Sequence, residues 1–155
     1  MSNFHSENEE PPVRHGAVIV VPEALSEDVT PPIAERRFLI IRRSARVIAP
    51  GKLCFPGGGL LPGESAEAAA EREFFEELGT RARIGRRIWE NVTPWRVHLV
   101  WFAATLAERA PSFHPAPEEV AEYFWLDLPA LMRHPDLLTS NLPFLESALA
   151  GKVVF

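Results

Sequence analysis

Three glutamates near the middle of the chain have the spacing that brings carboxylates together on a helix. Glu73, Glu76 and Glu77 stand at positions i, i+3 and i+4 of a segment rich in alanine and glutamate, so they share one face within about 100° of arc. No lysine stands at a helical spacing from them, and crowded carboxylates repel one another. Because hard oxygen ligands suit Mg²⁺ and Mn²⁺, the pattern favours a cation site. An ordinary solvated helix face is the alternative for these three residues taken alone.

A run of glycines precedes this segment. Gly57, Gly58 and Gly59 follow Pro56, and glycine lets a backbone turn sharply and approach a phosphate or a metal closely. We expect a short strand over 53–55 to stop at this run. A helix over 64–78 should follow, closed by Gly79. Its apolar residues Phe74, Phe75 and Leu78 are expected to face the core.

The register of the whole segment resembles the Nudix box. That box is a glycine, five residues, a glutamate, seven residues, an arginine–glutamate pair, an apolar residue, any residue, two glutamates, any residue, a glycine and an apolar residue. All seven fixed positions match, at Gly58, Glu64, Arg72, Glu73, Glu76, Glu77 and Gly79. Two packing positions differ, because Phe74 is aromatic where an aliphatic residue is usual and Thr80 replaces the last apolar residue. Residues 58–80 are therefore similar to the Nudix hydrolase family.

The resemblance implies a reaction and a metal. Family members use bound Mg²⁺, for which Mn²⁺ can substitute, and an activated water to hydrolyse a phosphoanhydride in a nucleoside diphosphate linked to another group. The metal ligands would be Glu73, Glu76, Glu77 and the backbone carbonyl of Gly58. The substrate would be a small nucleotide or nucleotide-like molecule, with ADP-ribose, dinucleoside polyphosphates, oxidised nucleotides and nucleotide sugars left open.

The resemblance also assigns catalytic and orienting roles. Family members often recruit a further acid from a loop outside the box, and Glu118 and Glu119 follow two prolines in such a loop. The alternative interpretation of this pair is that both are exposed loop residues without a catalytic role. The catalytic set would be Glu73, Glu76, Arg72 and Glu119. Arg72 and Glu64 would orient the box glutamates by charge-assisted hydrogen bonds.

Aromatic and basic residues outside the box are candidates for contact with substrate. Trp95, beside Pro94 in a predicted loop, is the leading candidate to stack on a base, whereas Trp101 and Trp125 lie in strand-like segments and are expected in the core. Three arginines before the glycines either meet substrate phosphates or form a solvated strand end: Arg42, Arg43 and Arg46.

Two other functions on the same fold stay open. The first is a catalytically inactive Nudix-fold nucleotide-binding or regulatory module, which typically loses box glutamates that this chain retains. The second is an isomerase of the isopentenyl diphosphate type, which needs a catalytic cysteine and a histidine-rich metal site. Cys54 could supply a thiol, but no matching histidine cluster stands in the sequence, and a buried thiol is the default interpretation.

Length and charge exclude several classes of protein. The 155 residues fit one domain, which we expect over 13–155 after a mobile tail over 1–12. The net charge of −5 argues against broad binding to nucleic acid polymers or anionic membranes. Residues 1–12 lack the basic region and apolar run of a signal peptide, so we expect a cytoplasmic protein. A homodimer is one assembly that the sequence allows.

The surrounding pattern predicts an α/β fold. Strands are expected over 13–22, 37–42, 82–92, 97–106 and 120–126. Asp127 should cap a short helix through Met132, and a last helix should run from Ser140 to before Gly151. With the helix of the box, these elements fit a Nudix-like α/β/α sandwich around a mixed β-sheet.

Overall fold

A computed structural model describes residues 10–25, 30–108 and 111–155. Most of the expected mobile tail over 1–12 lies outside the described residues, as do residues 26–29. In the described ranges no helix is both long enough and apolar enough to cross a membrane.

The elements follow one another much as the sequence predicts. The strands are β1 (Arg14–Val20), β2 (Arg37–Arg43), β3 (Leu53–Cys54), β4 (Gly57–Gly59), β5 (Ala82–Val92), β6 (Val97–Leu106) and β7 (Val120–Asp127). The helices are α1 (Ala66–Leu78), α2 (Leu128–Arg133) and α3 (Leu142–Leu149), with short 3₁₀ turns at Ile33–Glu35 and Thr139–Asn141.

The strands form two sheets. The larger sheet has the order β4-β1-β6-β5 and is mixed, because β1 and β6 run parallel while the other pairs are antiparallel. The smaller sheet, β3-β2-β7, is antiparallel throughout. The two sheets meet where β1 ends, since the Leu39 amide donates to the Val21 carbonyl at 2.9 Å.

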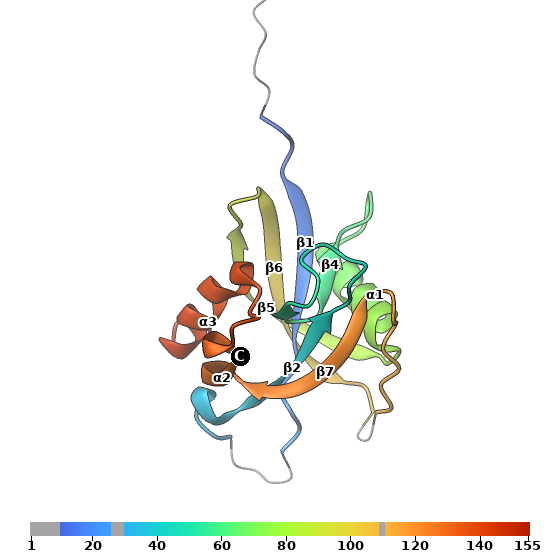
Figure 1. The fold of residues 1–155 in the computed structure, drawn as a ribbon. Helices are drawn as coiled ribbons and strands as arrows, with labels where there is room; N and C mark the ends of the chain where they lie inside the picture. Colours follow the sequence, from blue (N-terminus) through green and yellow to red (C-terminus); the bar gives the residue numbers. More distant parts are fainter. Residues whose placement is uncertain (1–9, 26–29, 109–110) are drawn as a thin grey trace, which may run out of the picture.

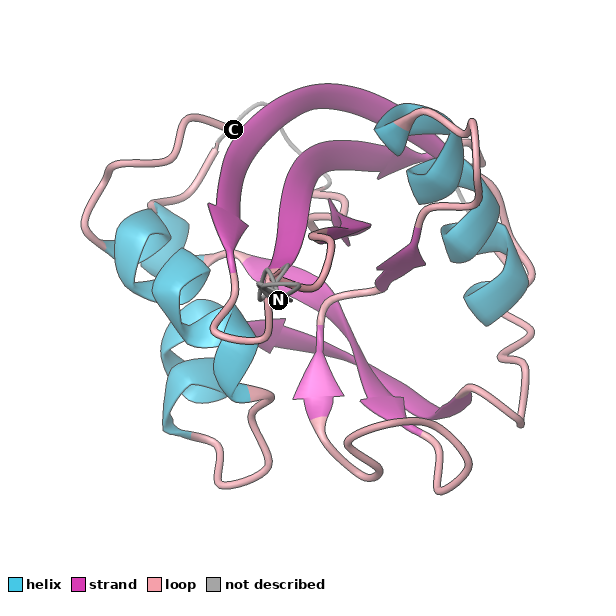
Figure 2. Cartoon of the chain, turned by 90° about the horizontal axis from the view of Figure 1, so that it is seen from above, coloured by secondary structure: helices cyan, strands magenta, loops and turns pink. Residues whose placement is uncertain are grey.

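Helices cover the strands from opposite sides. Figure 1 shows α1 on one side of the strands and α2 with α3 on the other, and the view from above in Figure 2 shows the same sandwich of layers. Alternate residues of β1 point to different cores: Ala17 and Ile19 pack with α1, and Val18 and Val20 pack with α3. Such two-sided burial explains why residues 17–20 of this strand are apolar at every position rather than at every second one.

Local sequence sets the ends of α1. The Ser65 hydroxyl accepts from the Ala68 amide at 3.1 Å, so Ser65 is the N-cap and the helix begins at Ala66 rather than at residue 64. Gly79 ends it in the left-handed region, with φ 65°. The glycines before the helix are not the loop we expected, because Gly57–Gly59 pair with β1 as the short strand β4.

One predicted burial is wrong. Phe74 and Leu78 of α1 are fully buried, but Phe75 is 47% exposed. The Arg81 guanidinium carbon lies 5.2 Å from the centroid of the Phe75 ring. The buried stripe runs through Ala70, Phe74 and Glu77, which are spaced by four and three residues. Phe75 falls one residue off that stripe, and a residue step on a helix turns the side chain by about 100°.

The two adjacent phenylalanines give a matched test of this packing. We expect Phe74→Ala to lower the free energy of unfolding by about 3–5 kcal/mol, because it leaves a cavity under α1. Phe75→Ala should cost about 1 kcal/mol or less, since it removes only a half-exposed ring and its contact with Arg81. Urea unfolding followed by circular dichroism measures both. Equal losses in the two variants would contradict the assigned orientation of the helix.

Candidate active site

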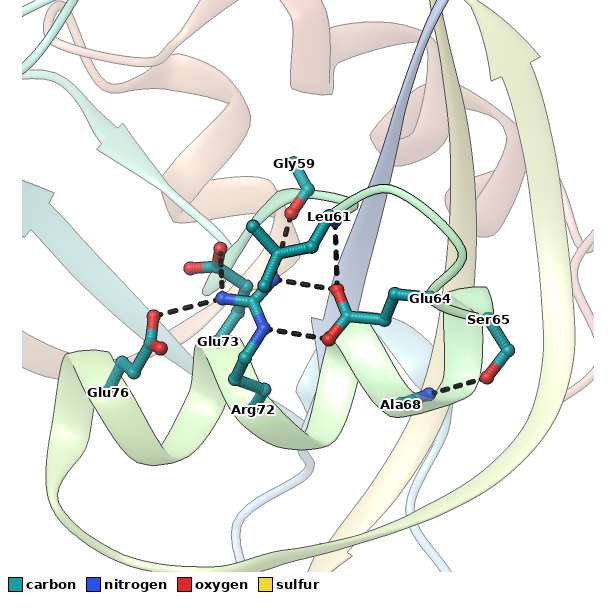
Figure 3. A network of polar contacts seen from close by, with 8 residues as sticks. All are labelled: Gly59, Leu61, Glu64, Ser65, Ala68, Arg72, Glu73 and Glu76. Carbon is teal, nitrogen blue, oxygen red and sulfur yellow. Dashed lines mark hydrogen bonds and ion pairs between the residues drawn. The ribbon is translucent and has the colours of Figure 1, made fainter.

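Arg72 of α1 lies at the centre of a network of carboxylates (Figure 3). Its Nε and Nη2 atoms donate to the two oxygens of Glu64 at 2.8 Å each, in a bidentate pair. Its Nη1 atom donates to Glu73 Oε1 and Glu76 Oε2, both at 3.0 Å. Nη2 also donates to the Gly59 carbonyl at 3.0 Å. One guanidinium therefore ties α1 to β4 and fixes three of the four box glutamates.

Glu64 is held on both sides. Its Oε1 atom accepts from the Leu61 amide at 3.1 Å as well as from Arg72. The Arg72 pair, followed by the Leu61 hydrogen bond, lowers the pKa of Glu64 from 4.5 to about 2. Glu64 thus remains a carboxylate at all physiological pH values and keeps Arg72 in place. This arrangement suits the orienting role that the resemblance implies for the pair.

Three carboxylates face a small cavity beside this network. The cavity has a volume of about 150 Å³ and is lined by Arg43, Val47, Gly57, Glu73, Glu77 and Glu119. Two of these acids come from α1, and the third comes from the loop before β7. We call this the carboxylate cavity.

Glu77 is the most buried of these acids. It is only 4% exposed, and its Oε1 atom accepts from the Gly57 amide at 2.8 Å. Burial raises its pKa well above the usual 4.5, and the neighbouring Glu73 and Glu119 raise it further. Burial also raises the pKa of Glu73, against the opposing effect of Arg72. Burial therefore disfavours the ionised form of both acids, and Arg72 offsets only part of this effect at Glu73.

Gly58 fits closely over Glu73. A Cβ atom on residue 58 would lie 2.4 Å from the Glu73 carboxyl carbon, so any side chain there would push this carboxylate aside. A glycine is therefore required at position 58 for steric reasons. The resemblance adds a second reason, since it implies that the Gly58 carbonyl contacts a metal.

The loop that carries Glu119 is bound to the end of α1. The amides of His114 and Ala116 donate to the carbonyls of Leu78 and Glu77, at 2.8 and 3.0 Å. These are carbonyls that a helix end leaves without a partner. A Cβ on Gly79 would lie 2.8 Å from the His114 Cβ, so the glycine also makes room for the loop.

A serine fixes the same loop from the other sheet. The buried Ser44 hydroxyl donates to the Glu118 carbonyl, and the Ser44 amide donates to the Glu119 carbonyl at 2.9 Å. We did not identify Ser44 from the sequence, because its partners are backbone atoms far along the chain. Arg43, which we noted only as one of three arginines, is the one of these that lines the carboxylate cavity.

The remaining predicted residues lie apart from the cavity. Glu76 is 47% exposed and contacts Arg72, so it stands at the edge of the group rather than in the cavity lining. Trp95 is 62% exposed in the turn between β5 and β6, as expected of a loop residue, and does not line the cavity. Trp101 is fully buried, as predicted, and Trp125 is partly buried against the core beside α1.

Cys54 is a buried free thiol, as predicted. Burial raises its pKa to about 12, so at neutral pH it is a protonated thiol and a poor nucleophile. This argues against the isomerase, which needs a reactive cysteine.

The carboxylate cavity has the chemistry of a site for Mg²⁺. Its donors are hard carboxylate oxygens, and two of its acids have raised pKa values that a neighbouring cation would lower. Among the described residues, no three acids, histidines or cysteines already converge closely enough to chelate one ion. The glutamate side chains would therefore have to turn inward on binding, and Glu73 would do so against its hydrogen bond to Arg72.

The Arg72–Glu64 pair makes a prediction about acid stability. Because the folded-state pKa of Glu64 is depressed to about 2, the stability it contributes is fully present above about pH 4.5 and is lost as the pH falls toward 2. We expect wild type to exceed Glu64→Gln in free energy of unfolding at neutral pH, and the difference to shrink as the pH falls below about 4.5. Urea unfolding at a series of pH values measures it. A pH-independent difference would show that Glu64 acts through packing alone.

The chain is similar to several known proteins. The model of the NUDIX domain matches residues 25–147. The chain is 29% identical over 116 residues to the NAD-capped RNA hydrolase NudC of Deinococcus radiodurans, covering 75% of this chain and 40% of that protein. It is 44% identical over 52 residues to the nucleoside triphosphatase NudI of Enterobacter sp. strain 638, covering 34% of this chain and 33% of that protein. The chain thus spans less than half the length of these curated relatives.

A solved structure shares the architecture. The MutT protein of Methanosarcina mazei Go1 superposes with a TM-score of 0.70 at 21% identity, over 92% of this chain and 96% of that one. This likeness confirms the predicted α/β sandwich. Since the family model also covers most of the chain, the protein belongs to the Nudix family.

Proposed function

We propose that this protein is a magnesium-dependent Nudix pyrophosphohydrolase that cleaves a phosphoanhydride in a nucleoside diphosphate-linked or nucleotide-like substrate, with Mn²⁺ as a substitute metal. The observation that supports the proposal is the carboxylate cavity, which Glu73, Glu77 and Glu119 line together with Arg43. Buried carboxylates are unfavourable unless they are paired or bind a cation, and a divalent ion with a substrate diphosphate would satisfy them.

The residues divide into ligands and positioning groups. Glu73 and Glu77 would hold the ion, with the Gly58 carbonyl beside them and Glu76 at the solvent side. When bound, the Mg²⁺ supplies charge screening at the phosphate oxygens and lowers the pKa of the attacking water. Glu64 and Arg72 keep the ligands in register through their bidentate pair.

Two further residues of the cavity would act on the substrate. Glu119, held by its loop against α1, would accept the proton of the attacking water. The Arg43 guanidinium would pair with phosphate oxygens, which it suits by geometry and permanent charge. Arg43 already contacts the loop of residues 44–52, because its Nε donates to the Ile48 carbonyl at 2.7 Å.

The relatives support a nucleotide substrate. The matched proteins are named for hydrolysis of an NAD cap and of nucleoside triphosphates, and both substrates contain phosphoanhydride bonds. The inactive binding module is the second candidate, but this chain retains Glu64, Glu73, Glu76 and Glu77 of the box.

A substrate panel tests the proposal. Purified protein would be incubated with Mg²⁺ and ADP-ribose, a dinucleoside polyphosphate, an oxidised nucleoside triphosphate or a nucleotide sugar, and the products would be separated by chromatography. We expect a mononucleotide from at least one substrate, and no turnover in excess chelator until Mg²⁺ or Mn²⁺ is restored. Binding of nucleotides without turnover of any of them would favour the inactive module.

Glu77→Gln separates the metal site from the fold. Gln keeps the size of Glu and can accept from the Gly57 amide, so stability should stay the same or rise as a buried charge is removed. We expect kcat to fall by two to four powers of ten, about 3–5 kcal/mol of transition-state stabilisation, with weaker Mg²⁺ binding. Glu71→Gln, on the exposed side of the same helix, is the matched control and should be neutral. Near-normal kcat in folded Glu77→Gln would remove Glu77 from the site.

Trp95 is proposed to bind the substrate base. Stacking on a base contributes about 1–3 kcal/mol, so Trp95→Ala should raise KM about tenfold with little effect on kcat or on thermal stability. Val92→Ala, at the end of β5, removes a comparably exposed apolar side chain and should leave KM unchanged. An unchanged KM in Trp95→Ala would exclude Trp95 from substrate recognition.

A further inference from the structure

Two histidines that are far apart in the sequence lie directly opposite each other in the larger sheet. His15 of β1 and His98 of β6 are paired in the parallel register of these strands. Paired residues of neighbouring strands project to the same face of a sheet, and here the two Nδ1 atoms lie 3.3 Å apart. The rings meet edge to face, with an interplanar angle of 85°. The sequence alone shows no metal-ligand spacing for either histidine, because only the pairing of the two strands brings them together.

A carboxylate orients one of these rings. His98 Nε2 lies 3.0 Å from Glu90 Oε2, a residue of β5. A carboxylate accepts hydrogen bonds, so Nε2 is the nitrogen that carries the proton. In a neutral imidazole this leaves Nδ1 with a free lone pair, and that is the nitrogen that approaches His15. Metal-binding histidines show the same arrangement, since they usually donate their other nitrogen to a carboxylate or carbonyl.

The separation of the two nitrogens fits a metal ion. Zn–N bonds are about 2.0–2.1 Å long, so two nitrogens bound to one tetrahedral ion stand about 3.3 Å apart. His15 is exposed and the His98 side chain is part-exposed, which leaves room for water as the remaining ligands. We propose that His15 and His98, oriented by Glu90, bind a borderline transition-metal dication such as Zn²⁺ through their Nδ1 atoms.

This site differs in chemistry and in place from the carboxylate cavity. Imidazole nitrogen suits Zn²⁺, Cu²⁺ and Ni²⁺, whereas carboxylate oxygen suits Mg²⁺ and Mn²⁺. None of the three residues lines the carboxylate cavity, and the third residue orients a ligand rather than binding the ion. The proposal therefore stands or falls independently of the hydrolase activity.

The site also touches the loop of the box. The Leu60 amide donates to the His15 carbonyl at 3.0 Å, and Arg72 donates to the neighbouring Gly59 carbonyl. An ion bound to the His15 ring would thus lie at the residue whose carbonyl holds the start of this loop.

Zinc binding to the full chain tests the proposal. Isothermal titration with Zn²⁺ in saturating Mg²⁺, which occupies hard-oxygen sites, should show one zinc ion per chain. The ring nitrogen signals of His15 and His98 should shift together in NMR spectra, and Mg²⁺ alone should not shift them. His15→Asn and His98→Asn should each weaken zinc binding by about tenfold or more, and Glu90→Gln by about tenfold. His114→Asn, which removes an exposed histidine elsewhere, is the control and should leave it unchanged.

Thermal melting of each variant in chelator checks that the fold is intact. The proposal would be overturned if zinc bound equally well to folded His15→Asn and His98→Asn. It would also be overturned if zinc failed to shift the two ring signals, because the pair would then hold no metal.

Discussion

Crowded negative charge in the second half of α1 is the constraint on which the site depends. Carboxylates are disfavoured in the last turn of a helix by the helix dipole, yet Glu76 and Glu77 stand there with Glu73 one turn before them, and Glu77 is buried. Arg72 offsets part of this charge through its contacts with Glu73 and Glu76. Glu77 has only the Gly57 amide as a hydrogen-bond partner among the described residues. The charge that remains inside the cavity is what makes a divalent cation an effective ligand there.

The fold brings the other half of the site to this helix through backbone contacts. The carbonyls at the end of α1 bind the loop before β7, and Ser44, directly after β2 of the smaller sheet, binds the same loop at Glu118 and Glu119. Helix, loop and second sheet are therefore joined at one place. The position of Glu119 consequently depends on main-chain hydrogen bonds that side-chain substitutions in the loop would largely preserve.

The sequence predicted those parts of the structure that depend on local pattern. The box residues, the Asp127 cap, which accepts from the Ala130 amide at 2.7 Å, and the burial of Trp101 follow from spacing and composition. The burial predicted for Phe75 was wrong, because this residue lies off the stripe that runs through Phe74 and Glu77. The pairing of His15 with His98 and the entry of Arg43 into the cavity could not be predicted, since strand register and loop docking join distant segments that no local pattern relates.

Crystals grown with Mn²⁺ and measured at the manganese absorption edge would test the central claim most directly, because anomalous scattering locates the ion without reference to activity. The account predicts a peak inside the carboxylate cavity, bounded by Glu73 and Glu77 and near the Gly58 carbonyl, with Glu119 facing it. A fully occupied manganese ion elsewhere, with the Glu77 carboxyl still hydrogen-bonded only to the Gly57 amide, would contradict this assignment of the metal site.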